Sequence, residues 1–288
     1  MTRGTSRYNF YFLHYLIASL STCLVGLLMW WMDSQVWGIN LWKSFTYLEL
    51  VYNPICEAPQ PEALFRQPLA TYTNLIFFFL GMSVFLLSLL DRKNENPPNN
   101  LLLRSPQYSA LFSLIFFTIF LASTIYHASM IRVMYIADLV GIYSFGAFFL
   151  LFNHWKLRYT HQPSFFHNHR KALMLFLLFM LLIVFPCTVF NFLTYKRYLL
   201  IFINVLVFIQ TIHFNIYRNK TSSKSLLILA ISLTVLTAIT SYLDSVLCST
   251  TSFSYGHSIF HLIAGCGLFC YYLFLRSERY GVHEDVLA

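Results

Sequence analysis

Three histidines in apolar segments have the type and spacing of a metal site. In YGHSIFHLIAG, His257 and His261 are four residues apart and therefore lie on one face of a helix. In LASTIYHASM, His127 follows Ser123 with the same spacing. Three neutral imidazoles with one open position form a ligand set of catalytic zinc, which lowers the pKa of bound water to about 7. We therefore interpret the three histidines as candidate zinc ligands.

Three further polar residues have types that assist hydrolysis at such a metal. Asp138, in IRVMYIADLVG, can take the proton of the attacking water or orient a ligand histidine. The Ser123 hydroxyl can donate a hydrogen bond to a developing oxyanion. Asp244 is a candidate outer partner of a ligand. Taken singly, each residue also has an ordinary explanation, because polar side chains in membrane helices often only hydrogen-bond their own helix or a neighbour.

The chain that carries these residues has the composition of a membrane protein. Charged residues make up 10% of its 288 residues and hydrophobic residues 58%, whereas soluble domains carry about 25% charged residues. Eight apolar runs approach the length that crosses a hydrocarbon core of about 30 Å at about 1.5 Å per residue. The runs are 10–31, 70–90, 106–127, 133–153, 172–194, 198–216, 225–247 and 257–275. We predict an all-α, polytopic membrane helical bundle.

Basic residues predict the orientation of this bundle. If the eight runs alternate in direction, most of the 19 Lys and Arg fall on the side that holds both termini, which the positive-inside rule makes cytoplasmic. The net charge of +8 therefore reflects topology and does not indicate nucleic-acid binding. The same alternation brings the three histidines, Ser123 and Asp138 within a turn or two of the non-cytoplasmic boundary. This common depth favours one zinc site over scattered structural residues.

Two of the six cysteines differ from the others in position. Cys56 and Cys248 fall on or beside the non-cytoplasmic face, where disulfides persist, while the others lie inside the apolar runs. Both a bridge between them and two separate thiols are compatible with the sequence.

Together, these motifs resemble those of the alkaline ceramidases, which belong to a superfamily of seven-span membrane hydrolases and receptors that includes the adiponectin-receptor-like proteins. The similar features are Ser-x-x-x-His in STIYH, an Asp eleven residues after that His, and His-x-x-x-His in HSIFH. The stretch ICEAPQPEALFRQPLATYTNLIFFFLGM resembles the family segment in which a Cys-Glu pair precedes an Asn-Leu-opened first core helix.

The resemblance covers about residues 54–276 and implies a domain organisation. Residues 1–53 would form an extra N-terminal transmembrane helix and the start of an outer loop. Residues 54–276 would form a seven-span ceramidase-like hydrolase domain, and residues 277–288 a cytoplasmic tail. The fold class is then a seven-span core preceded by one additional transmembrane helix.

The resemblance also implies an activity. The substrate would be ceramide or a related lipid amide, taken from the lipid bilayer and hydrolysed to a sphingoid base and a fatty acid. Zinc would be held by His127, His257 and His261. Asp138 would assist the water, and Ser123 would stabilise the oxyanion.

Two further features follow from the resemblance. It implies a disulfide between Cys56 and Cys248. The family's animal members also bind calcium in the segment before the first core helix, with several acids and an Asn, and Glu57 is the one such ligand that persists here. The other expected positions hold Pro54, Ile55, Pro59 and Gln67. This departure argues against calcium regulation.

Two other function classes remain open at this stage. A seven-span lipid receptor or binding protein can keep the same three histidines around a structural zinc. An ion-coupled transporter can use Asp138 and Asp244 as proton or ion sites. The sequence shows neither an inverted repeat nor a matching pair of Gly/Pro-broken spans, which disfavours the transporter.

Overall fold

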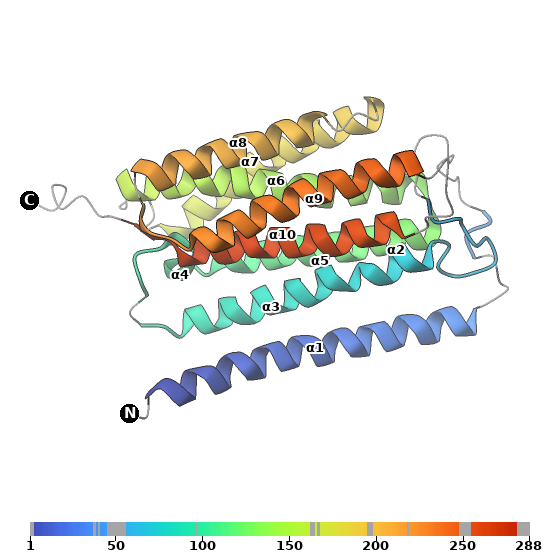
Figure 1. Ribbon diagram of the computed structural model, residues 1–288, viewed down its shortest axis with the longest axis horizontal. Helices are drawn as coiled ribbons and strands as arrows, with labels where there is room; N and C mark the ends of the chain where they lie inside the picture. Colours follow the sequence, from blue (N-terminus) through green and yellow to red (C-terminus); the bar gives the residue numbers. More distant parts are fainter. Residues whose placement is uncertain are drawn as a thin grey trace, which may run out of the picture.

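The structure is a computed structural model in which long helices run side by side as one bundle (Figure 1). It describes residues 3–36, 39, 41–44, 56–95, 97–161, 165, 168–194, 198–217, 219–247 and 255–280. The helices are α1 (Arg3–Gln35), α2 (Pro68–Thr73), α3 (Leu75–Arg92), α4 (Leu101–Arg104), α5 (Gln107–Ser129), α6 (Arg132–His161), α7 (His169–Thr194), α8 (Tyr198–Tyr217), α9 (Lys224–Leu247) and α10 (Gly256–Ser277). Two short strands, β1 (Asn219–Thr221) and β2 (Arg279–Tyr280), pair antiparallel.

Seven of the described segments are long and apolar enough to cross a membrane. They are Phe12–Gln35, Pro68–Arg92, Gln107–Ser129, Arg132–His161, Arg170–Thr194, Lys224–Asp244 and Gly256–Ser277. In α8 the apolar stretch, Leu199–Phe214, is shorter. Large apolar side chains such as Leu24, Phe185 and Ile228 are more than 60% exposed on the outside of the bundle, where water would solvate them poorly. The predicted all-α polytopic membrane bundle is confirmed.

The centre of the bundle is built from α5 and α6, which are joined by a tight turn. Met130 adopts a left-handed conformation with φ 56°, and its N–H donates to the Tyr126 carbonyl, which ends α5. Farther along the pair, Gly141 lets α6 approach α5 closely, because a Cβ at Gly141 would lie 3.2 Å from the Ile119 Cα. The two helices are therefore antiparallel neighbours, and the end of α5 lies beside the start of α6.

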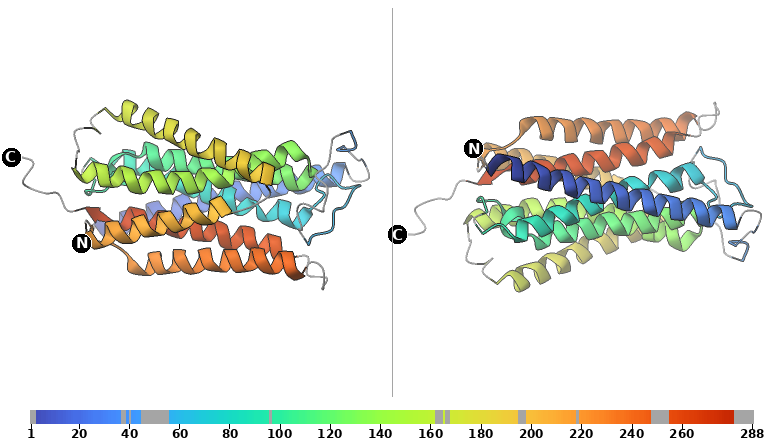
Figure 2. Two further views of the ribbon diagram at one scale, coloured as in Figure 1. Left: turned by 90° about the horizontal axis from the view of Figure 1, so that it is seen from above. Right: turned by 90° about the horizontal axis from the view of Figure 1, so that it is seen from below.

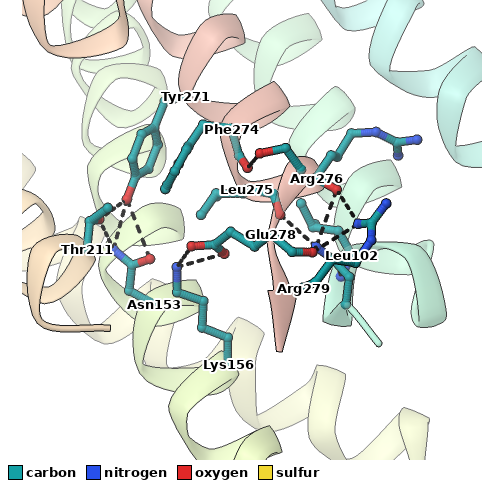
Figure 3. A network of polar contacts seen from close by, with 12 residues as sticks. Leu102, Asn153, Lys156, Thr211, Tyr271, Phe274, Leu275, Arg276, Glu278 and Arg279 are labelled. Carbon is teal, nitrogen blue, oxygen red and sulfur yellow. Dashed lines mark hydrogen bonds and ion pairs between the residues drawn. The ribbon is translucent and has the colours of Figure 1, made fainter. Parts of the chain in front are cut away.

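A buried polar network holds the end of α10 at the bundle end that also contains the start of α1 (Figures 1 and 3). The Lys156 ammonium lies 2.9 Å and 3.0 Å from the two carboxylate oxygens of Glu278, and neither side chain is exposed. The Asn153 amide donates to the Tyr271 hydroxyl at 3.0 Å and to Thr211 Oγ1 at 3.0 Å. Residues just after α10 are thus fixed to α6, although the sequence assigned them to a tail.

The additional helix α1 lies along the outer side of α3 (Figures 1 and 2). Ala18 is fully buried, and a Cβ at Gly26 would lie 3.2 Å from the Leu75 side chain. Beyond its apolar stretch, Asp33 Oδ1 accepts a hydrogen bond from the Phe65 N–H at 3.2 Å. The α1 helix therefore also contacts the segment of residues 56–67, which we call the lead-in segment, just before α2.

Candidate metal centre

The bundle brings the three predicted histidines together at the end opposite the Lys156 network. The ring centroids of His127 and His257 are 4.9 Å apart, those of His127 and His261 5.1 Å, and those of His257 and His261 4.6 Å. One ligand nitrogen from each ring lies within 4.8 Å of the others. His127 and His261 are 1% and 3% exposed, and the side chain of His257 is 15% exposed. The cluster is thus almost closed to solvent.

Local structure explains how residues 130 positions apart converge. His257 and His261 occupy the first two turns of α10. Because they are four residues apart, both side chains lie on one face of this helix. His127 lies in the last turn of α5, and α10 and α5 both pack against the short helix α2. The rings of Phe77 and His261 meet in an edge-to-face arrangement with their centroids 5.9 Å apart, so an apolar side chain packs against the cluster.

In each imidazole, Nδ1 faces a polar partner outside the cluster. His127 Nδ1 lies 2.8 Å from Gln67 Oε1, and His261 Nδ1 lies 3.1 Å from Thr73 Oγ1. His257 Nδ1 lies 3.9 Å from Asp244 Oδ2. Since Nδ1 of a metal-ligating histidine commonly donates to such a partner, the other ring nitrogen, Nε2, is left for a metal.

The donor set fits zinc. His127 Nε2 is buried and has no hydrogen-bond partner among the described residues. An orphaned ring nitrogen beside two other imidazoles is costly unless it is a ligand. Imidazole nitrogen is a preferred ligand of zinc, and three such ligands leave one position for a water or substrate.

The two residues predicted to assist catalysis lie on the helices next to the cluster. Ser123 is one turn before His127 on α5 and is 2% exposed. Asp138 is in the second turn of α6, just after the α5–α6 turn, and is 8% exposed. Neither is one of the three clustered metal-ligand candidates. Both therefore belong to the end of the bundle that holds the histidines, as their depth in the sequence predicts.

Asp244 reaches His257 because Gly256 leaves room for it. A Cβ at Gly256 would lie 2.4 Å from Asp244 Oδ1 and 3.0 Å from its Cβ. The first turn of α10 thus packs directly on the Asp244 side chain near the end of α9. This contact places a carboxylate beside His257.

The lead-in segment carries Cys56 and Glu57, which the sequence linked to a disulfide and to calcium. Cys56 Sγ lies 2.8 Å from the Asp244 carbonyl oxygen. Cys248 lies outside the described residues, so the bridge stays a prediction. The Glu57 carboxylate accepts hydrogen bonds from the N–H groups of Leu69 at 2.6 Å and Ala70 at 2.8 Å. Burial raises the pKa of the Glu57 carboxyl, while these two N–H groups act in the opposite direction.

The sequence did not identify the outer partners Gln67 and Thr73, nor the role of Gly256. Gln67 precedes Pro68, which marks the start of a helix, but its contact with His127 spans 60 residues of sequence. Thr73 contacts His261 across 188 residues. Only the packing of α2 between α5 and α10 reveals these pairs.

Comparison with known proteins adds one finding. The family model described as Ceramidase matches residues 68–285. The match begins at the first residue of α2 and includes the three histidines, Ser123, Asp138 and Asp244, whereas α1 precedes it. No curated protein and no solved structure matches the chain significantly.

Proposed function

Because this chain belongs to the ceramidase family, as its motifs predicted, we propose that it is a zinc-dependent hydrolase of lipid amides, with ceramide as the foremost substrate. The observation that supports this most strongly is the histidine cluster. Its three rings are buried, each has Nδ1 facing an outer partner, and His127 Nε2 is without one among the described residues.

The residues of the chain have complementary roles in this proposal. His127, His257 and His261 hold zinc, which when bound polarises the amide carbonyl and lowers the pKa of a water molecule to about 7. Asp138 accepts the proton of the water that attacks the carbonyl carbon and passes it to the nitrogen as the C–N bond breaks. Ser123 donates a hydrogen bond to the carbonyl oxygen as negative charge develops there. The products are a fatty acid and a sphingoid base.

The surroundings of the cluster suit a lipid substrate. Seven apolar segments are long enough to embed the protein in a bilayer, and the histidines lie in the last turn of α5 and the first two turns of α10, near one end of these segments. We propose, from the distribution of Lys and Arg, that this end faces the non-cytoplasmic side and that both termini are cytoplasmic.

The experiment is to purify the protein, measure its zinc content, and assay fatty-acid release from ceramides, acyl-amides and lipid esters. His261→Ala is expected to lose both zinc and activity, because one of three ligands is gone. His154→Ala is the matched control, since His154 is exposed at the opposite end of α6. If the wild type carries about one zinc per chain but hydrolyses none of these lipids, the hydrolase proposal fails and a receptor with structural zinc is favoured.

The roles of Ser123 and Asp138 are tested in the same assay. Ser123→Ala is expected to lower kcat by about 10²–10³-fold, the usual loss of one oxyanion donor. Asp138→Asn is expected to lower kcat by about 10²–10⁴-fold, the usual contribution of general acid–base catalysis. If either variant retains the wild-type kcat while holding zinc, the role assigned to that residue is wrong.

A further inference from the structure

The lead-in segment binds the end of α5 through its backbone. The Arg66 N–H donates to the Ala128 carbonyl at 3.0 Å, and the Gln67 N–H donates to the His127 carbonyl at 3.1 Å. The last carbonyl groups of a helix have no partner within the helix, so a neighbouring strand of chain often supplies one. The segment thus fixes the backbone at His127 itself.

The Gln67 side chain, which is fully buried, completes the contact. Its Nε2 lies 3.2 Å from the Glu57 carbonyl oxygen, and its Oε1 lies 2.8 Å from His127 Nδ1. A backbone carbonyl only accepts hydrogen bonds, so the amide nitrogen must face Glu57 and the amide oxygen must face His127. An amide oxygen also only accepts, so Nδ1 of His127 carries the proton and Nε2 carries the free lone pair.

We propose that Gln67 is a positioning residue of the metal centre. It holds His127 as the tautomer whose Nε2 faces the other two imidazoles, and it fixes the orientation of the ring. The inference rests on the proposed function, because it assigns a task to Gln67 only if the three histidines bind zinc.

Glu57 makes the position of Gln67 rigid. Its carboxylate is bound by the first N–H groups of α2, while its own carbonyl accepts the Gln67 amide. The N–H groups at the start of a helix have no partner within the helix and favour a negative charge, so Glu57 caps α2. The result is a chain of contacts from the α2 N-terminus through Glu57 and Gln67 to His127.

Thr73, at the other end of α2, repeats the arrangement at His261. Its hydroxyl lies 2.9 Å from the Leu69 carbonyl, which can only accept a hydrogen bond. When the hydroxyl proton is directed to Leu69, or to the Ala70 carbonyl at 3.1 Å, the hydroxyl oxygen is left as an acceptor for His261 Nδ1 at 3.1 Å. Residues at the two ends of α2 thus support the same tautomer in two of the three imidazoles.

The test compares Gln67→Met with Gln60→Met in the purified full-length protein. Gln67→Met keeps the length of the side chain but removes the acceptor, whereas Gln60 is exposed in the same segment. Zinc affinity is measured by competition with a chromogenic chelator, and kcat and KM are measured with a ceramide. Because outer partners of metal ligands typically contribute 10–100-fold, Gln67→Met is expected to bind zinc about 10–100-fold more weakly.

A second variant separates positioning from support of the fold. Gln67→Glu keeps an acceptor for His127 Nδ1 but loses the donor to the Glu57 carbonyl, so it is expected to recover most of the zinc affinity while remaining less heat-stable than the wild type. A structural role alone would lower stability in both Gln67 variants and leave the zinc affinity of the folded fraction unchanged. If Gln67→Met does not purify as folded protein, the same comparison is made with Gln67→Asn, whose amide is one methylene too short to reach both partners.

The outcomes separate this inference from the proposed function. If the wild type binds no zinc, the proposed function itself fails. If the wild type binds zinc and hydrolyses ceramide, but Gln67→Met matches Gln60→Met within twofold in zinc affinity and kcat, only the role of Gln67 is overturned. Labelling with ¹⁵N-histidine gives an independent readout: a proton found on Nε2 of His127 in the zinc-free protein would also overturn it.

Discussion

The buried ion pair between Lys156 and Glu278 is expected to be a main determinant of stability at the end of the bundle remote from the histidines. Both side chains of the pair are 0% exposed (Figure 3). The ammonium also lies 4.3 Å from the centroid of the Phe214 ring. Removal of one partner leaves the other charge buried without its counter-charge, which typically costs about 3–5 kcal/mol. We therefore expect Lys156→Met and Glu278→Gln each to lower the free energy of unfolding by about that amount.

A double-mutant cycle isolates the pair from other effects of the substitutions. In Lys156→Met/Glu278→Gln neither charge of the pair remains, so the double variant is expected to lose far less than the sum of the single variants. At about 2–4 °C per kcal/mol, each single variant should unfold roughly 6–20 °C below the wild type in a thermal scan in detergent. Zinc content per folded molecule should not change, because the pair lies at the opposite end from the metal centre.

Exposed residues of the same types serve as controls. Lys93→Met and Glu95→Gln lie in the connection after α3, where both side chains are exposed, and are expected to change stability by less than about 0.5 kcal/mol. The reasoning is refuted if the Lys156 and Glu278 variants behave like these controls. It is also refuted if the double variant loses the full sum, because the two charges then act independently.

Three further predictions concern the metal centre. Gly256→Ala should lower kcat in the ceramide assay without unfolding the protein, because the new Cβ would displace the Asp244 side chain from His257. Gly267→Ala, on the same helix, is the control. Asn74→Leu should raise the melting temperature, because the Asn74 carboxamide is fully buried without a partner among the described residues, which costs about 1–3 kcal/mol. The same substitution should lower kcat/KM in the ceramide assay, because Asn74 directly follows Thr73 beside the metal centre. Removal of metal with phenanthroline should abolish hydrolysis, and zinc but not millimolar calcium should restore it, because the site offers imidazole nitrogens, which suit zinc, whereas calcium takes oxygen ligands; restoration by calcium would contradict this.

The sequence was sufficient to predict the bundle and the histidine cluster, because both follow from the lengths of the apolar runs and from the positions of polar residues along them. Apolar runs near 20 residues have one common physical explanation, the bilayer. Once their direction alternates, the depth of each polar residue follows from its position along the run. His127, Asp138 and His257 could therefore be placed at one end of the bundle without any knowledge of side-chain packing.

The outer partners could not be predicted in the same way. The contacts of Gln67 and Thr73 depend on how α2 is inserted between α5 and α10, and the sequence shows only one continuous apolar run from residue 70. The structure divides that region at Asn74 into α2 and α3. Similarly, Glu278 reads as a polar residue after the last span, and its ion pair with Lys156 depends on β2 folding back onto the bundle.

The position of α2 explains why a six-residue helix is central to the site. Gln67 precedes its first residue and Thr73 is its last, so one rigid element sets the distance between the partners of His127 and His261. Glu57 caps the start of this helix, and the lead-in segment connects it through Phe65 to Asp33 of α1. A displacement of α2 would move both imidazoles together, whereas His257 depends on Asp244 and α9. The lead-in segment touches both supports, because Cys56 Sγ also lies 2.8 Å from the Asp244 carbonyl oxygen. Substitutions at Gln67 should therefore act on His127, whereas a substitution at Cys56 should act on the contact between His257 and Asp244.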